Sequence, residues 1–443
     1  MADSVFDSKS EIIEDAEVFE EDYTPDEILC RDEMMDEYVK VLRPIYKGRP
    51  PKNAFLYGDT GVGKTAVTKR LTDQLISDIK EQKDDHTLVA NEFSIVSDTV
   101  AFPHEVSEED DVDLTIIQLN CQNLPTKSDT NSSYQVAIAM VNEMRHREDK
   151  IATTGYAPQA VYNMLYEEID RVGGTFLVVL DEVDAIGTDD TILYELPRSR
   201  SNGDIHNARI GVIGISNDYT FRKNLSPKVQ DTLCEREIRF PAYEAQELGD
   251  ILAARCEVGL VDGSYSEENL RLASALARRD SSGSARKAID IIKRAAEIAE
   301  DQGATELKDT YIREAHEDLQ QGDMVSSITH QDSHKLIALG ALAEAERLGQ
   351  TPIRTKTFHE AYQKFAEGTN TEALTLRGFH NHLSRLSMFG FVEELTNNEG
   401  RKGGRYNEYQ FSEDLSGETV KEAFDTMNDI EWVTIRIRPG AEG

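Results

Sequence analysis

The 443-residue sequence predicts an α/β fold in which helices cover both faces of a parallel sheet, followed by a helical domain and a third domain carrying a strand hairpin. Three observations predict it. Four short apolar runs alternate with helical stretches, a block of amphipathic helices follows them, and the charge balance changes near residue 330. A chain of this length exceeds one ordinary domain, so two or three separate cores are expected.

The four apolar runs are rich in β-branched residues and nearly continuous, which is typical of buried parallel strands. They span residues 53–58, 114–121, 175–182 and 208–217. Residues 80–113 contain eleven acidic and two basic side chains, and they predict a surface insertion. The aperiodic acidic residues 1–20 predict a disordered tail, with order from about Tyr23. We therefore expect the sheet domain over residues 21–242.

The helical block runs from residue 245 to about 319 and predicts a separate helical domain over residues 243–325. Its clearest helix is "SARKAIDIIKRAAEIAED". Spacings of three and four place one set of apolar side chains on a single face, which is expected to be buried. That set is Ala285, Ile289, Ile292 and Ala296.

Residues 326–443 predict a winged-helix domain, because three amphipathic helices precede two strands around a basic turn. Residues 330–411 hold ten basic and ten acidic side chains, whereas the whole chain has a net charge of −35. In the third helix we expect Leu376, Phe379, Leu383 and Leu386 to be buried. The opposite face presents side chains of the types that read base edges, namely Arg377, Asn381, Ser384 and Arg385. The turn between the strands presents Arg401, Lys402 and Arg405 toward phosphates or a minor groove.

The net charge argues against nonspecific nucleic-acid binding, so DNA binding must come from this locally neutral domain. The acidic net charge favours adaptation to a salt-rich cytoplasm. At molar salt the Debye length is roughly 3 Å, so repulsion among the carboxylates is largely screened. The alternative is a partner that is itself basic. The four cysteines form no CxxC pair, which is typical of intracellular proteins. No signal-peptide pattern and no apolar run of about 20 residues is present, so we expect a cytoplasmic protein that makes no use of membranes.

The stretch "GDTGVGKT" matches the phosphate-loop pattern GxxxxGK[ST] between a predicted strand and a predicted helix. Backbone N–H groups of such a loop surround nucleotide phosphates, and we expect this from Gly58, Thr60, Gly61, Val62 and Gly63. Lys64 would reach the β and γ phosphates, and Thr65 would offer its hydroxyl to Mg²⁺. The predicted ligands are therefore ATP or ADP with Mg²⁺.

Polar side chains follow the later strands, at the edge where a parallel sheet binds ligands. Asp181 would hold Mg²⁺ and Glu182 would orient an attacking water. Asn217 could touch the γ-phosphate or cap a turn. Arg286 begins an amphipathic helix off its apolar face, so it is either a site residue or a solvated arginine.

These elements in this order resemble an AAA+ ATPase, and more closely the archaeal replication initiators of the origin-recognition-complex and cell-division-cycle family. The resemblance implies an ATP-binding initiator, of haloarchaeal type, that grips double-stranded origin DNA through a winged helix and an AAA+ insertion. ATP would act as a slow conformational switch with weak ATPase activity, and a replicative helicase and further copies of the chain would be partners. The matching motifs are residues 18–67, 118–140, 193–218 and 282–300, with "LDEVDAI" and "RFPAY".

The resemblance also implies roles for single residues. Asn217 matches the family's sensor-1 position and Arg286 its sensor-2 position, while Tyr243 and Arg255 match nucleotide contacts. In "LSPKVQDTL", Lys228 stands where the family has an arginine finger, and a lysine lacks the planar fork of arginine. We therefore expect slow hydrolysis, unless Arg198 or Arg200 substitutes for the arginine finger; the alternative is that both are solvated loop arginines.

The family's DNA-contacting insertion corresponds to residues 122–150, which would otherwise be an ordinary loop. Two further hypotheses remain open. One is an initiator paralogue that acts in repair or replication control. The other is a nucleotide-switched regulator whose winged helix binds protein.

Overall fold

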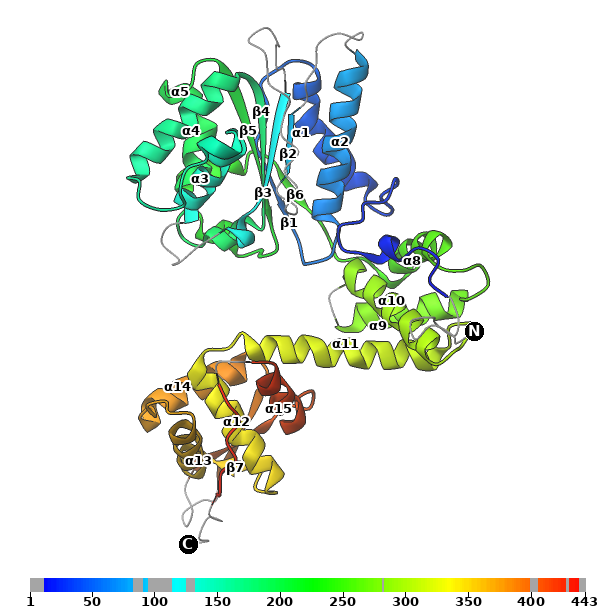
Figure 1. Cartoon of the computed structure of the whole chain (residues 1–443), viewed down its shortest axis with the longest axis vertical. Helices are drawn as coiled ribbons and strands as arrows, with labels where there is room; N and C mark the ends of the chain where they lie inside the picture. Colours follow the sequence, from blue (N-terminus) through cyan, green and yellow to red (C-terminus); the bar gives the residue numbers. More distant parts are fainter. Residues whose placement is uncertain are drawn as a thin grey trace. The chain divides into compact units, whose positions relative to one another are not determined.

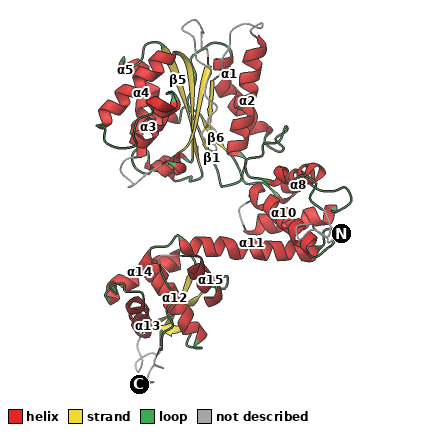
Figure 2. Cartoon of the chain, in the orientation of Figure 1, coloured by secondary structure: helices red, strands yellow, loops and turns green. Residues whose placement is uncertain are grey.

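The computed structural model describes residues 12–82, 91–94, 114–124, 132–280, 283–398, 405–427 and 430–437. The chain divides into two compact units, residues 1–312 and 313–443. The first unit holds the sheet and the helical domain, and the second holds the winged helix (Figure 1 and Figure 2). Each unit is built around its own core, as the length of the chain predicts.

The sheet of the first unit has, within the described residues, six parallel strands in the order β2-β3-β4-β5-β1-β6. The four predicted runs are confirmed as β1, β3, β4 and β5. The two edge strands were not predicted, because "NEFS" and "EIR" are short and polar. Strand β2 lies within the predicted acidic insertion, most of which is outside the described residues. The strands are β1 (Ala54–Tyr57), β2 (Asn91–Ser94), β3 (Leu114–Asn120), β4 (Gly174–Asp181), β5 (Ala208–Ser216) and β6 (Glu237–Arg239).

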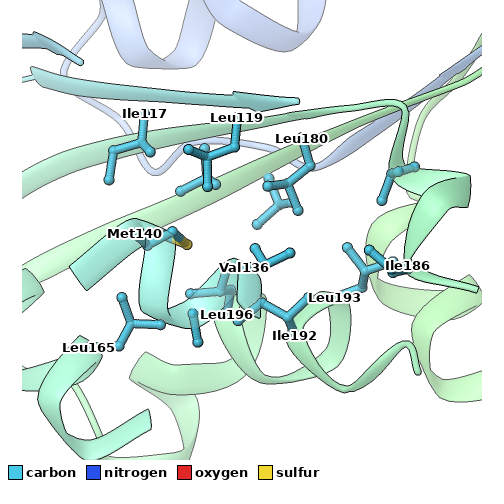
Figure 3. Close-up of a cluster of buried hydrophobic side chains, with 14 of the residues drawn as sticks. Ile117, Leu119, Val136, Met140, Leu165, Leu180, Ile186, Ile192, Leu193 and Leu196 are labelled. Carbon is cyan, nitrogen blue, oxygen red and sulfur yellow. The ribbon is translucent and has the colours of Figure 1, made fainter. Parts of the chain in front are cut away.

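Helices cover both faces of this sheet, as predicted, because successive strand side chains point to opposite faces. Figure 3 shows one of the two cores, where Ile117 and Leu119 of β3 and Leu180 of β4 pack against Val136 and Met140 of α3. The helices of this face are α3 (Ser132–Glu143), α4 (Pro158–Val172), α5 (Thr191–Asn202) and α7 (Pro227–Leu233). The other face is covered by α1 (Asp32–Tyr46) and α2 (Lys64–Gln82).

The helical domain consists of four consecutive helices, of which the last continues past residue 312. They are α8 (Ala245–Gly259), α9 (Glu267–Asp280), α10 (Ala285–Asp301) and α11 (Asp309–Thr329). The buried stripe of α10 includes Ile292 and Ala296, as predicted, but Ala285 and Ile289 are only half-buried. The buried face instead includes Ala288 and Ile291, so it is rotated round the helix relative to the predicted one. In the first turn of α10, the amide of Ala285 donates to the carbonyl of Gly61 in the phosphate loop at 2.9 Å.

The predicted disordered tail is corrected by the structure, which shows residues 12–20 packed against the helical domain. Ile12, Val18 and Phe19 are buried. The amides of Ile12 and Ile13 donate to Oε1 of Glu300 at 2.6 and 2.9 Å. These three buried apolar side chains attach the acidic segment to the helical domain. The prediction of disorder considered only the charge pattern and therefore missed them. Residues 1–11 lie outside the described residues.

The winged helix of the second unit contains the three predicted helices and the two predicted strands. They are α12 (Ser333–Arg347), α13 (Thr355–Gly368), α14 (Leu376–Met388), β8 (Val392–Asn398) and β9 (Arg405–Phe411). A short strand β7 (Ile353–Arg354) completes an antiparallel sheet in the order β7-β9-β8, and α15 (Gly417–Thr426) follows. Phe379, Leu383 and Leu386 are fully buried, whereas Leu376 is 47% exposed, contrary to expectation.

Across the described residues, none of the helices combines the length and apolar character needed to span a bilayer.

Candidate nucleotide site and nucleic-acid interface

The phosphate loop connects β1 to α2 at the carboxyl edge of the sheet. Gly61 and Gly63 adopt φ values of +75° and +90°, which favour glycine. A Cβ atom on Gly61 would lie 2.0 Å from Oγ of Ser284, and one on Gly63 would lie 2.9 Å from the hydroxyl of Tyr243. The glycines therefore serve two purposes, since they also let the helical domain and its linker approach the loop.

Lys64 is held inside this loop. Its Nζ donates to the carbonyl oxygens of Gly58 at 2.8 Å and Asp59 at 2.7 Å, and to Oδ1 of Asn217 at 2.7 Å. Burial lowers the pKa of Lys64 to about 8. The structure thus brings Asn217, at the end of β5, to the loop lysine, because β5 and β1 are adjacent parallel strands.

The two predicted carboxylates lie at the end of β4. The Thr65 hydroxyl donates to Oδ2 of Asp181 at 2.7 Å, so the two predicted Mg²⁺ ligands are in contact. Glu182 has a left-handed backbone, with a φ of 49°, which is unusual for a residue other than glycine. Burial and the charges of Asp181 and Asp184 raise its pKa, while a hydrogen bond from Asn120 and the charge of Arg286 oppose that rise.

Asn120 and Asp184 belong to this site, although the sequence analysis missed both. Asn120 ends β3 directly beside Asp181 in the strand register. Oδ1 of Asp184 accepts from the Ser216 hydroxyl at 2.7 Å and from the backbone N–H of Asn217 at 3.2 Å, which orients Asn217. A signal existed for Asn120, since it is a polar residue that ends an apolar strand in the same way as Asp181 and Asn217.

Arg31 is the other residue that sequence reasoning missed, and it is 1% exposed. Its Nε donates to the carbonyl of Val62 at 2.9 Å and its Nη2 to that of Pro241 at 2.8 Å. Burial lowers its pKa. Because its guanidinium carbon is 3.3 Å from the centroid of the Tyr243 ring, Arg31 joins the phosphate loop to the linker that leads into the helical domain.

The remaining predicted nucleotide contacts are engaged with other parts of the chain. Tyr243 is 3% exposed, with its ring on Arg31. Arg286 pairs with Glu21. Arg255 donates to the carbonyl of Val18 at 2.9 Å and lies over the Tyr23 ring, 4.3 Å from its centroid. The N-terminal segment therefore contacts both arginines, and their roles toward a nucleotide stay predictions.

Lys228 and Arg198 lie beside the same aromatic ring. Nζ of Lys228 is 5.6 Å, and Cζ of Arg198 5.1 Å, from the centroid of Tyr194. Both cations are exposed. Arg200 differs from them, because its Nη1 donates to the carbonyl of Ala208 at 2.6 Å. Of the two arginines considered as substitutes for an arginine finger, only Arg198 lies beside Lys228 on the Tyr194 ring.

The residues present fit Mg²⁺ held together with a nucleotide. Mg²⁺ usually binds one or two protein oxygens and takes its other ligands from water and phosphate. Thr65 and Asp181 match that requirement. Among the residues that the structure describes, no group of three or more His, Cys, Asp or Glu side chains could hold an ion by itself.

The candidate nucleic-acid interface is the solvent face of α14. Arg377, Asn381, Ser384 and Arg385 are all exposed on it. Arg401 and Lys402 lie outside the described residues, and Arg405 begins β9 opposite Asn398. In the predicted AAA+ insertion, residues 125–131 also lie outside them, and Ser133 is buried, with its amide 3.0 Å from Oδ2 of Asp189.

Comparison with known proteins decides the family. Residues 49–216 match the AAA domain, residues 249–317 the Cdc6 AAA+ ATPase-type lid domain, and residues 326–422 the CDC6 C-terminal winged helix domain. ORC1-type DNA replication protein 15 of Haloarcula marismortui is 43% identical over 432 residues, which are 98% of this chain and 96% of that protein. The chain belongs to the ORC1-type DNA replication proteins.

A second ORC1-type relative, DNA replication protein 10 of Halobacterium salinarum, is 39% identical over 96% of this chain and 94% of its own length. The ORC1 protein of Aeropyrum pernix, solved in complex with DNA, superposes with a TM-score of 0.73 at 27% identity, over 94% of this chain and 97% of that one. The ORC2 protein of the same organism shares the fold, with a TM-score of 0.54 at 21% identity, over 94% and 98% of the two chains. The predicted family and its three-domain fold are confirmed.

Proposed function

We propose that this ORC1-type protein binds origin DNA through its winged helix and AAA+ insertion, and that ATP and ADP switch its conformation slowly. The observation that carries the proposal is the exposed face of α14, with Arg377, Asn381 and Arg385 on a domain of balanced charge. Guanidinium and amide groups are the side chains that bind base edges bidentately. The family relationship supports it, since the Aeropyrum pernix ORC1 protein is in complex with DNA in its structure.

The nucleotide part of the proposal rests on contacts between the phosphate loop and the helical domain. The Gly61 carbonyl accepts from the Ala285 amide, and Gly63 lies under the hydroxyl of Tyr243. A change in the phosphates held by the loop and Lys64 would therefore shift the position of α10 and its linker through these contacts. Mg²⁺, held by Thr65 and Asp181, would neutralise charge on the phosphate oxygens.

Hydrolysis would depend on Glu182 as the residue that orients water, with Asn217 beside Lys64 and Arg286 at the start of α10. Tyr243 and Arg255 are the proposed nucleotide contacts of the linker and of α8. Lys228 offers a point charge where an arginine would bind bidentately, which favours slow turnover over a fast motor. A long-lived nucleotide state suits a switch, and the ATP-bound conformation would support helicase recruitment and self-association on DNA.

Footprinting on the DNA that flanks this protein's own gene tests the proposal, in molar KCl with ATP and with ADP. We expect protection of an inverted repeat that depends on the nucleotide. Arg385→Ala should weaken binding at one base position, and Arg401→Ala should weaken all sequences alike. Lys421→Ala, an exposed lysine of α15, is the matched control and should bind like the wild type. Absence of any selective protection by the wild type would overturn the proposal.

A nucleotide-switched regulator whose winged helix binds protein is the second candidate. It is favoured by Met388 and Phe389 at the end of α14, which are 76% and 54% exposed. Adjacent exposed apolar side chains suit a protein contact. This candidate predicts a protein partner that Met388→Ser releases, with no footprint on any DNA.

A further inference from the structure

Leu376 occupies an unusual position for a large apolar side chain. It is the first residue of α14 and is 47% exposed, whereas Phe379, Leu383 and Leu386 of the same helix are fully buried. Its backbone position is set by Thr375, whose hydroxyl oxygen accepts from the Gly378 amide at 3.4 Å. About half of the surface of Leu376 therefore faces solvent.

Two of the side chains proposed to read DNA are neighbours of Leu376 on this helix. Arg377 follows it directly and Asn381 lies one turn beyond Arg377; both are exposed, as is His380, one turn after Leu376. In the first two turns of α14, every residue of which the structure describes, no other large apolar side chain is exposed. Leu376 is therefore an apolar group at the start of a polar recognition face.

Recognition helices of this kind place their N-terminal residues against base edges in the major groove. The groove presents hydrogen-bond donors and acceptors, and its apolar group is the C5-methyl of thymine. A leucine can gain nothing from the polar groups there, but it can cover this methyl. We propose that Leu376 contacts a thymine C5-methyl and so selects thymine at one position of the bound DNA, an inference that rests on the proposed DNA-binding function.

The expected preference is modest and independent of salt. Removing one methyl group from water is worth about fourfold in the dissociation constant. Contacts to phosphates weaken steeply as salt rises, because bound counterions are released. An apolar contact releases none, so the preference for thymine should be equal at 0.2 and 2 M KCl, while the overall affinity falls.

Deoxyuridine tests this directly, because it is thymidine without the methyl group. The full chain is first used to select its preferred duplex from random sequence, and each thymine is then replaced in turn. At one position per binding site, wild type should bind the deoxyuridine duplex about fourfold more weakly. Leu376→Ala should bind both duplexes equally there, and Leu376→Met, which keeps the apolar volume, should retain the preference.

Leu348→Ala is the matched control, since Leu348 is also an exposed leucine of this unit but follows α12 and does not belong to α14. It should keep the thymine preference of the wild type. If Leu376→Ala keeps that preference at every position, or if the wild type shows none, the inference is overturned. If the wild type selects no duplex at all, the proposed DNA-binding function fails and this inference fails with it.

Discussion

The guanidinium of Arg31 stacks on the ring of Tyr243, with the Cζ atom 3.3 Å from the ring centroid and both side chains buried. Since Arg31 also bonds the Val62 and Pro241 carbonyls, one side chain connects the phosphate loop, the linker and the first helix. Lysine keeps the charge but cannot make these contacts together. We expect Arg31→Lys to lower the free energy of unfolding by about 2–4 kcal/mol.

Urea unfolding followed by circular dichroism measures this loss. Arg43→Lys is the control, because Arg43 lies in α1, the helix that follows Arg31, but is exposed, and it should change little. Trp432, the single tryptophan, packs on Phe365 and Phe424 of the other unit, so its fluorescence transition should stay unchanged in both variants. Equal stability of the two variants would contradict the connecting role of Arg31.

Nucleotide affinity should depend on pH through Lys64, whose pKa burial lowers to about 8. Phosphate binding favours the charged ammonium, so affinity for ADP should be constant up to about pH 7. It should then fall as the pH rises through 8, approaching tenfold per pH unit. Lys64→Arg should bind more weakly at pH 7 but show a flat profile to pH 9. Calorimetric titration with ADP measures both, and a flat wild-type profile would refute the prediction.

The same shift affects stability with a definite sign. The folded-state pKa of Lys64 is about 8, below its ordinary value of 10.5, so between these values the unfolded chain binds more protons. Stability contributed by this residue therefore rises with pH across that window. Lys64→Met should lose the rise. The free energies of unfolding of the wild type and of Lys64→Met, measured at pH 7.5 and 10, give the comparison. An equal pH dependence in the two proteins would contradict the predicted contribution of Lys64.

Asn120 should control the acid limb of ATP turnover through Glu182. Its hydrogen bond holds the pKa of Glu182 down against burial and the nearby carboxylates. Asn120→Ala should raise that pKa, so turnover should be lost at a higher pH as the solution is acidified, and Asn120→Asp should move the limb further. Asn123→Ala, at an exposed position nearby, should keep the wild-type profile. An unchanged limb in Asn120→Ala would show that the hydrogen bond has no influence on turnover.

Lys228 should limit hydrolysis between copies of the chain. An arginine can bind a transferring phosphoryl group through two parallel hydrogen bonds, which lysine cannot do. Lys228→Arg should raise turnover at least about tenfold under conditions where the protein self-associates, and Lys228→Ala should lower it. Lys223→Arg is the control, because this exposed lysine lies over Tyr219 instead. If Lys228→Arg hydrolyses ATP at the same rate as the wild type, Lys228 does not limit turnover.

Much of the fold could be predicted from the sequence because its signals are local. Continuous apolar runs identify β1, β3, β4 and β5, and the glycine spacing around Lys64 identifies the phosphate loop. The short polar strands β2 and β6 have no such signal, since only pairing with their neighbours makes them strands. The same holds for the site. Asp181 and Asn217 could be predicted because they end apolar strands, whereas Arg31 and Asp184 carry no such local signal.

By itself, the sequence determined the order of domains, the family, and the chemistry offered at the carboxyl edge of the sheet. Tertiary structure alone decided that Arg31 is buried against Tyr243, that residues 12–20 pack on the helical domain, and that Leu376 faces solvent. The physical reason is that periodicity reports which face of an element is apolar. Whether the first turn of a helix or an acidic tail is covered depends on segments far away in the chain.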